Sequence, residues 1–556
     1  MSEPMLKTPL DMFHEREKNH PNRVFLRQPL NGQWHEYTWG EAGRQARRMA
    51  QVLHDLGCQK GDRVAILSKN CAHWIMADLA IMMAGCVSVP LYPTQQADSI
   101  EYVLQHSETK VIFVGKLDEG PKMEPGIPAS VKRIRFPYPD PMQAEHDWKE
   151  LVENGPGLTG QYRPDPDDLA SIIYTSGTTG FPKGVMHSFR TIAHAAMGYR
   201  QTFDCSPEDR FFSYLPLSHV AERVLVEMNG IYCGATISFA ESLDTFAQNL
   251  RDVAPTAFFS VPRLWKKFQQ GILEKVPQEK LDRLLAIPVV SGLIKRKIRK
   301  GLGLHKCRSI GSGAAPIAPS LQAWYQKIGI DILEGYGLTE NFAYATANRI
   351  GKNRIGTVGA AQPHTEVNIA ENGEIWIKNK AAMLGYYKDP ASTAEVLFDG
   401  AIRTGDMGEI DADGCLKITG RIKEIFKTDT GKYVAPAPIE NHFLADNPYI
   451  EQLCITGNTL PSPVALCVLT ESARKQPQEL ILKEFSESLL RLNKKLDKHE
   501  RINRCILIHE DWTVDGGMMT PTLKVKRHQV EAKYRHVISK AMLADQPIVY
   551  EHHLPQ

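Results

Sequence analysis

The chain has 556 residues, of which 42% are hydrophobic, so it can bury large cores and its length implies two or more domains. With 66 basic and 64 acidic residues the net charge is only +2, which gives no overall signal for nucleic-acid binding. The ten cysteines include no CxxC pair, so neither a zinc site nor a disulfide framework is indicated, and we expect reduced thiols in a cytoplasmic chain. The charged N-terminus lacks the apolar core of a signal peptide.

Short β-rich runs alternate with helical ones along much of the chain, a pattern that predicts stacked α/β layers. The most apolar segment, 74–93, is broken by Asp78, Gly85 and Pro90, so it predicts a buried helix followed by a strand rather than a membrane span. Buried strands are expected at 63–67, 110–114, 211–215, 256–261 and 330–333.

The pattern changes at 367–379 and 401–419, where alternating residues are punctuated by turn dipeptides typical of hairpins. These are Asn372-Gly373, Asp399-Gly400 and Asp413-Gly414. We therefore predict an N-terminal domain at 1–420, with a small β subdomain near 360–420, and a C-terminal domain at 421–556. The boundary is placed at 421–423.

The string at 174–184, YTSGTTGFPKG, follows a short apolar run and combines glycines, hydroxyl side chains and one lysine. Glycines let backbone N–H groups approach an anion, hydroxyls donate hydrogen bonds and lysine supplies charge, so the string predicts a loop that binds polyphosphate. It is not the P-loop of Walker-type ATPases, because Lys183 is followed by Gly184 rather than by Ser or Thr.

This string resembles the phosphate loop of the adenylate-forming superfamily, which includes acyl-CoA synthetases, luciferases and peptide-synthetase adenylation domains. Further strings follow in the family's order: YLPLSHVAER from Tyr214, SVPRLW from Ser260, SGAAP from Ser312, EGYGLTE from Glu334, RTGDMGEID from Arg403, GRIKEIFK from Gly420 and TPTLKVKR from Thr520. These sequence strings look most like those of the long-chain fatty acyl-CoA synthetase branch. The resemblance implies an α/β fold with a large, multi-layered N-terminal domain of mixed sheets and helices, plus a small, mobile α+β C-terminal lid domain.

The resemblance also implies roles for individual residues in binding ATP. Glu340 would hold Mg²⁺, assisted by Thr175, and Thr339 would contact the α-phosphate. Pro316 stands where a dinucleotide fingerprint would need its third glycine, so an NAD site is rejected. The implied ATP- and AMP-binding residues are Thr175, Ser176, Gly177, Thr178, Thr179, Gly180, Lys183, Ser312, Ala314, Ala315, Pro316, Gly335, Tyr336, Asp406 and Arg421.

In the C-terminal part, Lys524 resembles the family's adenylation lysine, with Arg527 three positions on. Many members have glycine before this lysine, whereas this chain has Leu523, so Lys526 remains a competing assignment. By the same resemblance, Lys423 marks the hinge about which the small domain turns. Gly431 and Tyr433 would lie near coenzyme A.

The acyl pocket is less well defined, because fold-level analogy does not fix a substrate. The resemblance assigns His219, Val261 and Trp265 to it, although a tryptophan on an apolar strand, as Trp265 is expected to be, more often belongs to the core. The segment 284–308 places an apolar patch beside several basic residues, which predicts either peripheral contact with an anionic membrane or a solvated face.

We therefore expect an enzyme that activates a medium- or long-chain fatty acid with ATP and Mg²⁺ to an acyl-adenylate, then transfers the acyl group to coenzyme A. One alternative is a ligase that loads a carrier protein's phosphopantetheine, and another is a CoA ligase for an aromatic or other carboxylate. A non-catalytic binding protein would be expected to have lost Lys524, Glu340 or Asp406, and all three are present. No nucleic-acid partner is expected, and the oligomeric state stays open.

Overall fold

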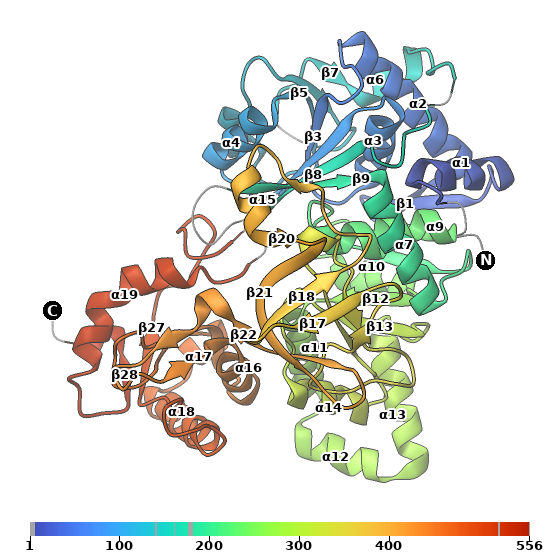
Figure 1. The fold of residues 1–556 in the computed structure, drawn as a ribbon. Helices are drawn as coiled ribbons and strands as arrows, with labels where there is room; N and C mark the ends of the chain where they lie inside the picture. The colour runs from blue at the N-terminus through green and yellow to red at the C-terminus, as the bar shows by residue number, and fades with distance from the viewer. Residues whose placement is uncertain (1–5, 140–141, 161, 176–181, 521–522, 555–556) are drawn as a thin grey trace. The chain divides into compact units, whose positions relative to one another are not determined.

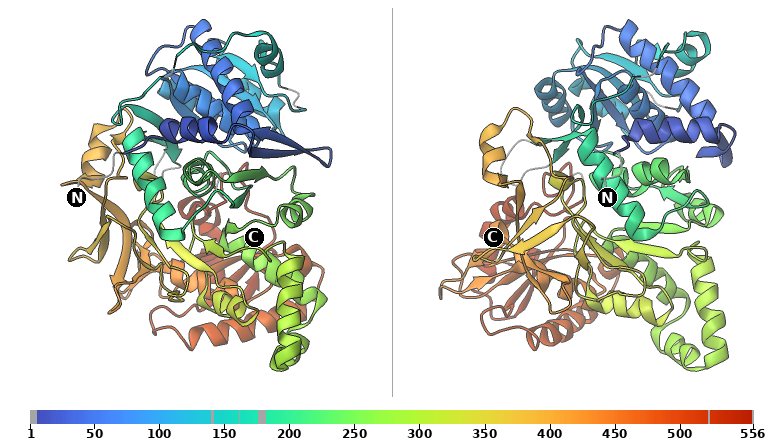
Figure 2. Two further views of the ribbon diagram at one scale, coloured as in Figure 1. Left: turned by 90° about the vertical axis from the view of Figure 1, so that its right-hand side faces the viewer. Right: turned by 45° about the vertical axis from the view of Figure 1, so that its right-hand side comes forward.

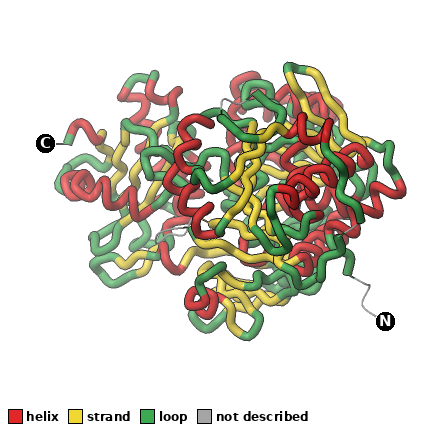
Figure 3. The backbone as a smooth tube through the Cα atoms, turned by 90° about the horizontal axis from the view of Figure 1, so that it is seen from above, coloured by secondary structure: helices red, strands yellow, loops and turns green. Residues whose placement is uncertain are grey.

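A computed structural model describes the chain apart from residues 1–5, 140–141, 161, 176–181, 521–522 and 555–556. The chain divides into two compact units. The first comprises Met1–Ala315, Trp324–Asn368 and Trp376–Thr404, and the second comprises Pro316–Ala323, Ile369–Ile375 and Gly405–Gln556. The domain boundary at 421–423 stays a prediction. Helices and strands are mixed along the chain (Figure 3).

The main sheet of the first unit has eight strands (Figure 1). Its central strands are parallel, whereas β9 pairs antiparallel with both β8 and β19. β3 and β5 confirm the strands predicted at 63–67 and 110–114. The spatial order is β19 (Gly385–Tyr386), β9 (Lys183–Ser188), β8 (Leu169–Thr175), β4 (Val87–Leu91), β3 (Arg63–Ser68), β5 (Thr109–Gly115), β6 (Lys132–Arg135) and β7 (His146–Asp147).

The predicted buried helix and strand at 74–93 are α3 (Ala72–Met83) and β4. Every residue of α3 is buried, including Asp78, whose carboxylate pairs with the buried Arg223 guanidinium. A helix that is apolar on all sides has no solvent face to present, which explains its central position. It packs beside α2 (Trp39–Asp55).

Two further sheets belong to the first unit. One has the order β10 (Arg210–Ser213), β11 (Thr236–Phe239), β1 (Val24–Leu30) and β2 (Gln33–Thr38). The other has the order β12 (Ala257–Ser260), β13 (Ser309–Ser312), β14 (Leu333–Tyr336), β15 (Thr346–Ala347) and β16 (Ala360–Ala361).

The strand predicted at 330–333 is wrong in its bounds, because pairing with β13 begins only at Leu333, opposite Gly311. Ile330 and Ile332 are buried in the segment that leads into β14. An apolar run therefore marked burial here rather than extended backbone. The strands predicted at 211–215 and 256–261 are confirmed as β10 and β12, with slightly different ends.

The remaining helices connect and cover these sheets. α12 and α13 form a helical hairpin that projects from the rest of its unit (Figure 2). A π-helical segment, Arg223–Met228, lies between α8 and α9. The helix bounds are α1 (Pro9–Asn19), α4 (Ala97–Ser107), α5 (Gly120–Met123), α6 (Trp148–Asn154), α7 (Phe189–Phe203), α8 (Val220–Glu222), α9 (Asn229–Cys233), α10 (Phe246–Val253), α11 (Pro262–Lys275), α12 (Gln278–Ala286), α13 (Pro288–Gly301), α14 (Pro319–Lys327) and α15 (Pro390–Val396).

The three predicted turn dipeptides all lie between strands. The strands are β17 (Glu366–Ile369), β18 (Glu374–Lys378), β20 (Leu397–Phe398), β21 (Ala401–Ile410) and β22 (Leu416–Arg421). Asp399 and Gly400 both have positive φ, at +49° and +71°, as a two-residue hairpin turn requires. Gly373 and Gly414 are also left-handed, at +84° and +78°.

The second unit is built on the four-stranded sheet β25 (Ile450–Thr456), β26 (Val464–Leu469), β27 (Arg504–Ile508) and β28 (Ile548–Tyr550). In β26, Ala465, Cys467 and Leu469 enter one core, and Val464, Leu466 and Val468 enter another. Side chains alternate along a strand, so helices must cover both faces. Accordingly, α18 and α19 lie on opposite sides of β27 and β28 (Figure 1). The helices are α16 (Pro436–Asp446), α17 (Glu471–Arg474), α18 (Gln478–Asn493) and α19 (Arg527–Ala541).

Among the residues that the structure describes, no helix has the length and apolar character needed to cross a bilayer. All ten cysteines are free thiols, and every one except Cys205 is buried.

Candidate active site

Three of the sequence motifs meet at one edge of a parallel sheet. β12, β13 and β14 are parallel neighbours, with Ser260 opposite Ser312 and Ser312 opposite Glu334. SVPRLW continues from β12, SGAAP from β13 and EGYGLTE from β14. The carboxyl ends of parallel strands are where ligands bind in open α/β sheets. This edge is therefore a candidate nucleotide site.

The predicted phosphate loop is closed at its base by two antiparallel strands. Thr175, the last residue of β8, pairs with Lys183, the first residue of β9, and both are half-buried. The predicted loop residues Ser176, Gly177, Thr178, Thr179 and Gly180 lie outside the described residues. The pairing of β8 with β9 thus fixes Thr175 and Lys183 at the two ends of the loop.

The ammonium group of Lys183 contacts a segment more than two hundred positions further along the chain. Its Nζ is 2.5 Å from Ser392 Oγ and 3.7 Å from Asp389 Oδ2. It also lies 5.2 Å from the centre of the Tyr386 ring. Asp389 is itself the N-cap of α15, where its Oδ1 accepts from the Ser392 N–H at 2.9 Å. Lys183 therefore has an anionic and an aromatic partner within its own unit.

Thr339 and Glu340 form the start of a 3₁₀ turn, Thr339–Asn341, just after β14. The Thr339 carbonyl accepts a hydrogen bond at 2.7 Å from Nε2 of the buried His187 on β9. Burial lowers the pKa of His187 to about 4, so the ring is neutral near pH 7. The Glu340 Oε1 accepts from the Tyr386 hydroxyl at 2.7 Å, and the Glu340 carbonyl accepts from the Met383 N–H at 2.7 Å.

The SGAAP string forms a tight bend above β13. A side chain at Gly313 would meet the carbonyl oxygen of Gly335 at 2.9 Å, which explains why only glycine fits there. Ala314 has φ +63°, and Ala314, Ala315 and Pro316 are exposed. Gly335 and Tyr336 lie on the neighbouring strand β14 and pair with β15. Small residues and an aromatic ring are the kinds of side chain that suit a flat adenine.

The predicted acyl-pocket residues lie at helix starts. His219 precedes α8, and its Nδ1 accepts from the Ala221 N–H at 3.2 Å. Val261 precedes α11, and Trp265 lies in the first turn of this helix, so its expected position on a strand is wrong. Trp265 is fully buried and contacts Phe258, Phe268 and Tyr325 edge-on. A role of these residues in the acyl pocket stays a prediction.

The string YLPLSHVAER also contains a buried polar cluster. Glu222 accepts hydrogen bonds from the Ser213 hydroxyl at 2.7 Å and from the Tyr214 N–H at 3.0 Å. Burial raises the pKa of Glu222 to about 8. The fully buried Arg223 donates to the Ser171 hydroxyl of β8 at 2.8 Å and to Glu227 at 3.1 Å. This string therefore also ties β10 and the π-helical segment to the strand below the phosphate loop.

In the second unit, Asp406 of β21 lies opposite Arg421 of β22, and Arg421 Nε is 3.1 Å from Asp406 Oδ1. Lys524 interacts electrostatically with both. Desolvation by surrounding protein and repulsion from Arg421 lower the pKa of Lys524, opposed by Asp406 and Glu424. The Lys524 residue is nevertheless exposed. The structure thus brings three predicted residues, Asp406, Arg421 and Lys524, together.

The other predicted residues of this unit lie in turns. Lys423 is exposed in the 3₁₀ turn Ile422–Glu424 directly after β22. Gly431, with φ +81°, lies in the turn between β23 (Phe426–Lys427) and β24 (Tyr433–Val434). Tyr433 is 66% exposed, with Lys427 Nζ 5.6 Å from its ring centre.

The competing lysine, Lys526, is followed by an arginine with a partner of its own. Lys526 is the residue before α19. Arg527 binds both oxygens of Glu440, at 2.8 and 2.9 Å, and is nearly buried. The electrostatic interaction with Asp406 therefore belongs to Lys524, and Arg527 pairs with Glu440.

Sequence reasoning missed the segment Gly385–Ser392, GYYKDPAS. Asp389 followed by Pro390 is a recognisable helix start, with an N-cap and a proline at the first position. The contacts of Tyr386 and Asp389 with Lys183 and Glu340 had no such signal, because they depend on the pairing of β19 with β9.

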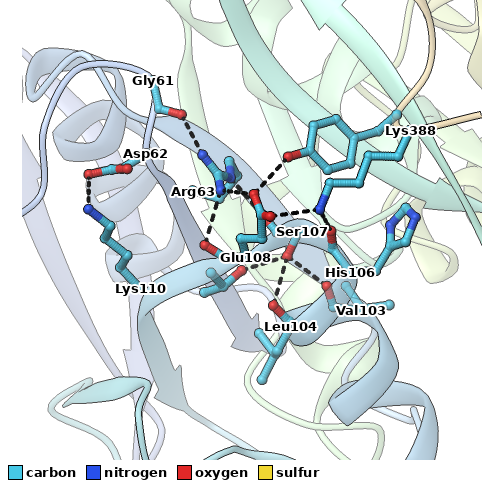
Figure 4. Close-up of polar contacts among 12 residues, drawn as sticks. Gly61, Asp62, Arg63, Val103, Leu104, His106, Ser107, Glu108, Lys110 and Lys388 are labelled. Atoms are coloured by element: carbon cyan, nitrogen blue, oxygen red, sulfur yellow. Dashed lines mark hydrogen bonds and ion pairs between the residues drawn. The ribbon is translucent and has the colours of Figure 1, made fainter.

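On its other side, the same segment contacts the end of α4 through Lys388 (Figure 4). Lys388 Nζ lies 2.9 Å from Glu108 Oε1 and 3.0 Å from the His106 carbonyl. Glu108 also pairs with Arg63 at 2.7 Å. The segment is thus held on both sides.

The described residues contain no group of three or more His, Cys, Asp or Glu side chains arranged to hold a metal ion. Mg²⁺ does not need such a group when it enters with a nucleotide, because one or two carboxylates suffice together with phosphate and water. Glu340 has one carboxylate oxygen bound by Tyr386 and a second oxygen as a hard ligand. The donor set fits Mg²⁺ carried by ATP.

Two family models match the chain. The model described as AMP-binding enzyme matches residues 13–387, and the model of the AMP-binding enzyme C-terminal domain matches residues 424–545. The chain belongs to the AMP-binding enzyme family. A long-chain-fatty-acid–CoA ligase of Mycobacterium bovis is similar to this AMP-binding enzyme, with 31% identity over 94% of this chain and 95% of that protein. The peroxisomal long chain acyl-CoA synthetase 7 of Arabidopsis thaliana is 29% identical, covering 91% of this chain and 82% of that protein.

Solved structures show the same fold. An anthranilate CoA ligase in complex with anthranoyl-AMP has a TM-score of 0.80 at 20% identity, covering 97% of this chain and 99% of the other. The adenylation domain of a carboxylate reductase from Mycobacterium chelonae has a TM-score of 0.82 at 22% identity, covering 97% and 91%. The predicted α/β fold and the resemblance to adenylate-forming enzymes are therefore confirmed.

Proposed function

We propose that this AMP-binding enzyme is an acyl-CoA synthetase that activates a medium- or long-chain fatty acid with ATP. The acyl-adenylate then reacts with coenzyme A to give acyl-CoA and AMP. The observation that carries the proposal is the convergence of Lys183 and Glu340 on Tyr386, beside the sheet edge that bears SGAAP. Relatives with long-chain-fatty-acid–CoA ligase names, similar over nearly the whole chain, support the substrate class.

The first half reaction brings two anions together. The fatty carboxylate oxygen attacks the α-phosphorus of ATP, and the bond to pyrophosphate breaks. Lys183 and the loop that it closes would bind the phosphates, with Thr175 and Glu340 as ligands of the Mg²⁺ that accompanies ATP. Thr339 would contact the α-phosphate, and Lys524 would stabilise charge on the carboxylate and phosphate oxygens.

Residues of several motifs would hold the nucleoside. The bend at Ser312, Ala314, Ala315 and Pro316 would border the adenine, together with Gly335 and Tyr336. The Asp406 carboxylate would accept hydrogen bonds from the ribose hydroxyls, and Arg421 would hold this carboxylate in place. A carboxylate that is already oriented loses less freedom when it accepts two hydroxyl groups.

The second half reaction needs no nucleophile from the enzyme. The thiol of coenzyme A attacks the acyl carbon, and the bond from that carbon to the AMP oxygen breaks. Lys423 would act as the hinge between the two steps, and Gly431 and Tyr433 would contact coenzyme A. The exposed Tyr433 ring suits a contact with an extended ligand.

A carrier-protein ligase is the competing function, and thiol exchange separates the two. Preformed oleoyl-AMP would be mixed with the enzyme and either coenzyme A or a phosphopantetheine-bearing carrier protein. Formation of oleoyl-CoA supports the synthetase. Release of the acyl group only to the carrier protein would contradict it.

We also propose peripheral contact between the α12–α13 hairpin and an anionic membrane, with the protein otherwise in the cytoplasm. α13 has no buried residue, and Ile287, Val289 and Leu293 are 51%, 79% and 64% exposed. Exposed basic residues follow on the same helix, namely Arg296, Lys297 and Lys300. Exposed apolar side chains beside a basic ridge suit an anionic lipid surface.

A further inference from the structure

One side chain links the candidate metal ligand to the lysine of the phosphate loop. The Tyr386 hydroxyl donates to Glu340 Oε1 at 2.7 Å, while the face of the same ring lies 5.2 Å from Lys183 Nζ. Tyr386 is 8% exposed. Its ring is therefore packed in place rather than free to swing into solvent.

The backbone around Tyr386 is fixed from both sides. Tyr386 pairs with Val185 of β9, and its N–H donates to the Thr393 hydroxyl of α15 at 2.8 Å. The next N–H, that of Tyr387, donates to the Gly184 carbonyl at 2.7 Å. Because β9 also begins with Lys183, the ring and the lysine are mounted on the same pair of strands.

The Tyr386 hydroxyl acts as a hydrogen-bond donor to Glu340. A tyrosine hydroxyl has an ordinary pKa of about 10, so it can donate at neutral pH, and Glu340 Oε1 accepts from it at 2.7 Å. An ionised carboxylate has only acceptors, so a donated hydrogen bond fixes which oxygen remains for a cation. In this geometry Oε1 accepts from Tyr386, and Oε2, which accepts no hydrogen bond from the residues that the structure describes, can meet a ligand.

We propose that Tyr386 is a positioning residue for Mg²⁺-bound ATP: its hydroxyl orients Glu340 toward the cation, and its ring holds Lys183 at the phosphates. This inference rests on the proposed function. It assigns a role to the GYYKDPAS segment. The motifs identified in the sequence did not include this segment.

The test uses Tyr386→Phe, which removes the hydroxyl and keeps the ring. Tyr387→Phe is the matched control, because Tyr387 is the neighbouring tyrosine and its hydroxyl faces Glu108, at 3.4 Å. Binding of α,β-methylene-ATP, in which the α–β bond cannot be cleaved, is measured by calorimetry without fatty acid over a range of Mg²⁺ concentrations. Tyr386→Phe should need about tenfold more Mg²⁺ for half-maximal binding, as expected for loss of a hydrogen bond to a charged group. Tyr387→Phe should match the wild type.

A double-mutant cycle with Glu340→Gln then tests the route of the effect. In the Glu340→Gln background, Tyr386→Phe should cause no further change in the Mg²⁺ requirement. An equal shift in both backgrounds would overturn the proposal, as would a Tyr386→Phe protein that binds like the wild type. If the wild type itself does not bind the nucleotide, the proposed function fails first, and this inference fails with it.

Discussion

Thr520 and Lys524 are joined by two hydrogen bonds: the Thr520 N–H donates to the Lys524 carbonyl at 2.8 Å, and the Lys524 N–H donates to the Thr520 hydroxyl at 3.1 Å. The residue before the lysine, Leu523, has φ +59°. Related enzymes that resemble this chain often have glycine there, and the left-handed backbone explains that preference. Thr520 thus holds the backbone of Lys524 in place.

Leu523→Gly should therefore be tolerated. A left-handed conformation costs an L residue about 1–2 kcal/mol, and removing that strain offsets the greater freedom of glycine in the unfolded chain. We expect the melting temperature and the rate of adenylate formation to stay near the wild-type values. Leu523→Val should lower both, because a β-branched residue fits this region worst. Equal behaviour of the two variants would contradict the assigned backbone.

Lys524→Ala should abolish acyl-adenylate formation and spare thiolysis of supplied acyl-AMP. Loss of a donor to developing charge costs on the order of a hundredfold or more in rate. The measurement is ATP–pyrophosphate exchange for the first step and release of acyl-CoA for the second. Lys526→Ala is the control and should retain exchange. The assignment is wrong if Lys526→Ala is the inactive variant, or if Lys524→Ala loses both steps equally.

The buried Glu222 predicts a pH dependence of stability. Its pKa is raised to about 8 by burial, against 4.5 as its ordinary value, so the folded state keeps a proton that the unfolded chain releases. The contribution is full below the unfolded pKa and is lost as pH rises toward 8. The stability of the wild type should therefore fall relative to Glu222→Gln between about pH 5 and pH 8, by at most about 1.4 kcal/mol per pH unit. Parallel melting profiles across that range would refute the assignment.

The α12–α13 hairpin can be tested by vesicle flotation. Replacing Arg296, Lys297 and Lys300 with glutamine should reduce recovery with anionic vesicles severalfold, because each basic residue near such a surface contributes about 1 kcal/mol. The control replaces Lys494, Lys495 and Lys498, which are exposed just after α18 and carry the same charge. Equal recovery of the wild type and the hairpin variant would exclude this contact.

Local signals predicted much of the fold. The apolar run at 74–93 gave α3 and β4, and the Asn-Gly and Asp-Gly dipeptides marked real turns, because both depend on a few adjacent residues. The run at 330–333 was misassigned, because apolar residues report burial without specifying backbone conformation. Asp406, Arg421 and Lys524 could be named from their motifs.

The partners of the site residues could not be named in this way. Tyr386 lies 46 positions from Glu340, and Lys183 is 209 positions from Ser392. Those contacts depend on the pairing of β19 with β9, and the packing of the whole unit determines that pairing. The sequence likewise did not predict the left-handed backbone of Leu523, because leucine rarely adopts this conformation.

Pyrophosphate release from ATP and Mg²⁺ should be measured with acids from acetate to oleate plus aromatic acids, each with and without coenzyme A. We expect a signal that peaks at a medium or long fatty chain and is stimulated by coenzyme A. Release confined to aromatic or short acids, or no release with any acid, would contradict the proposed function.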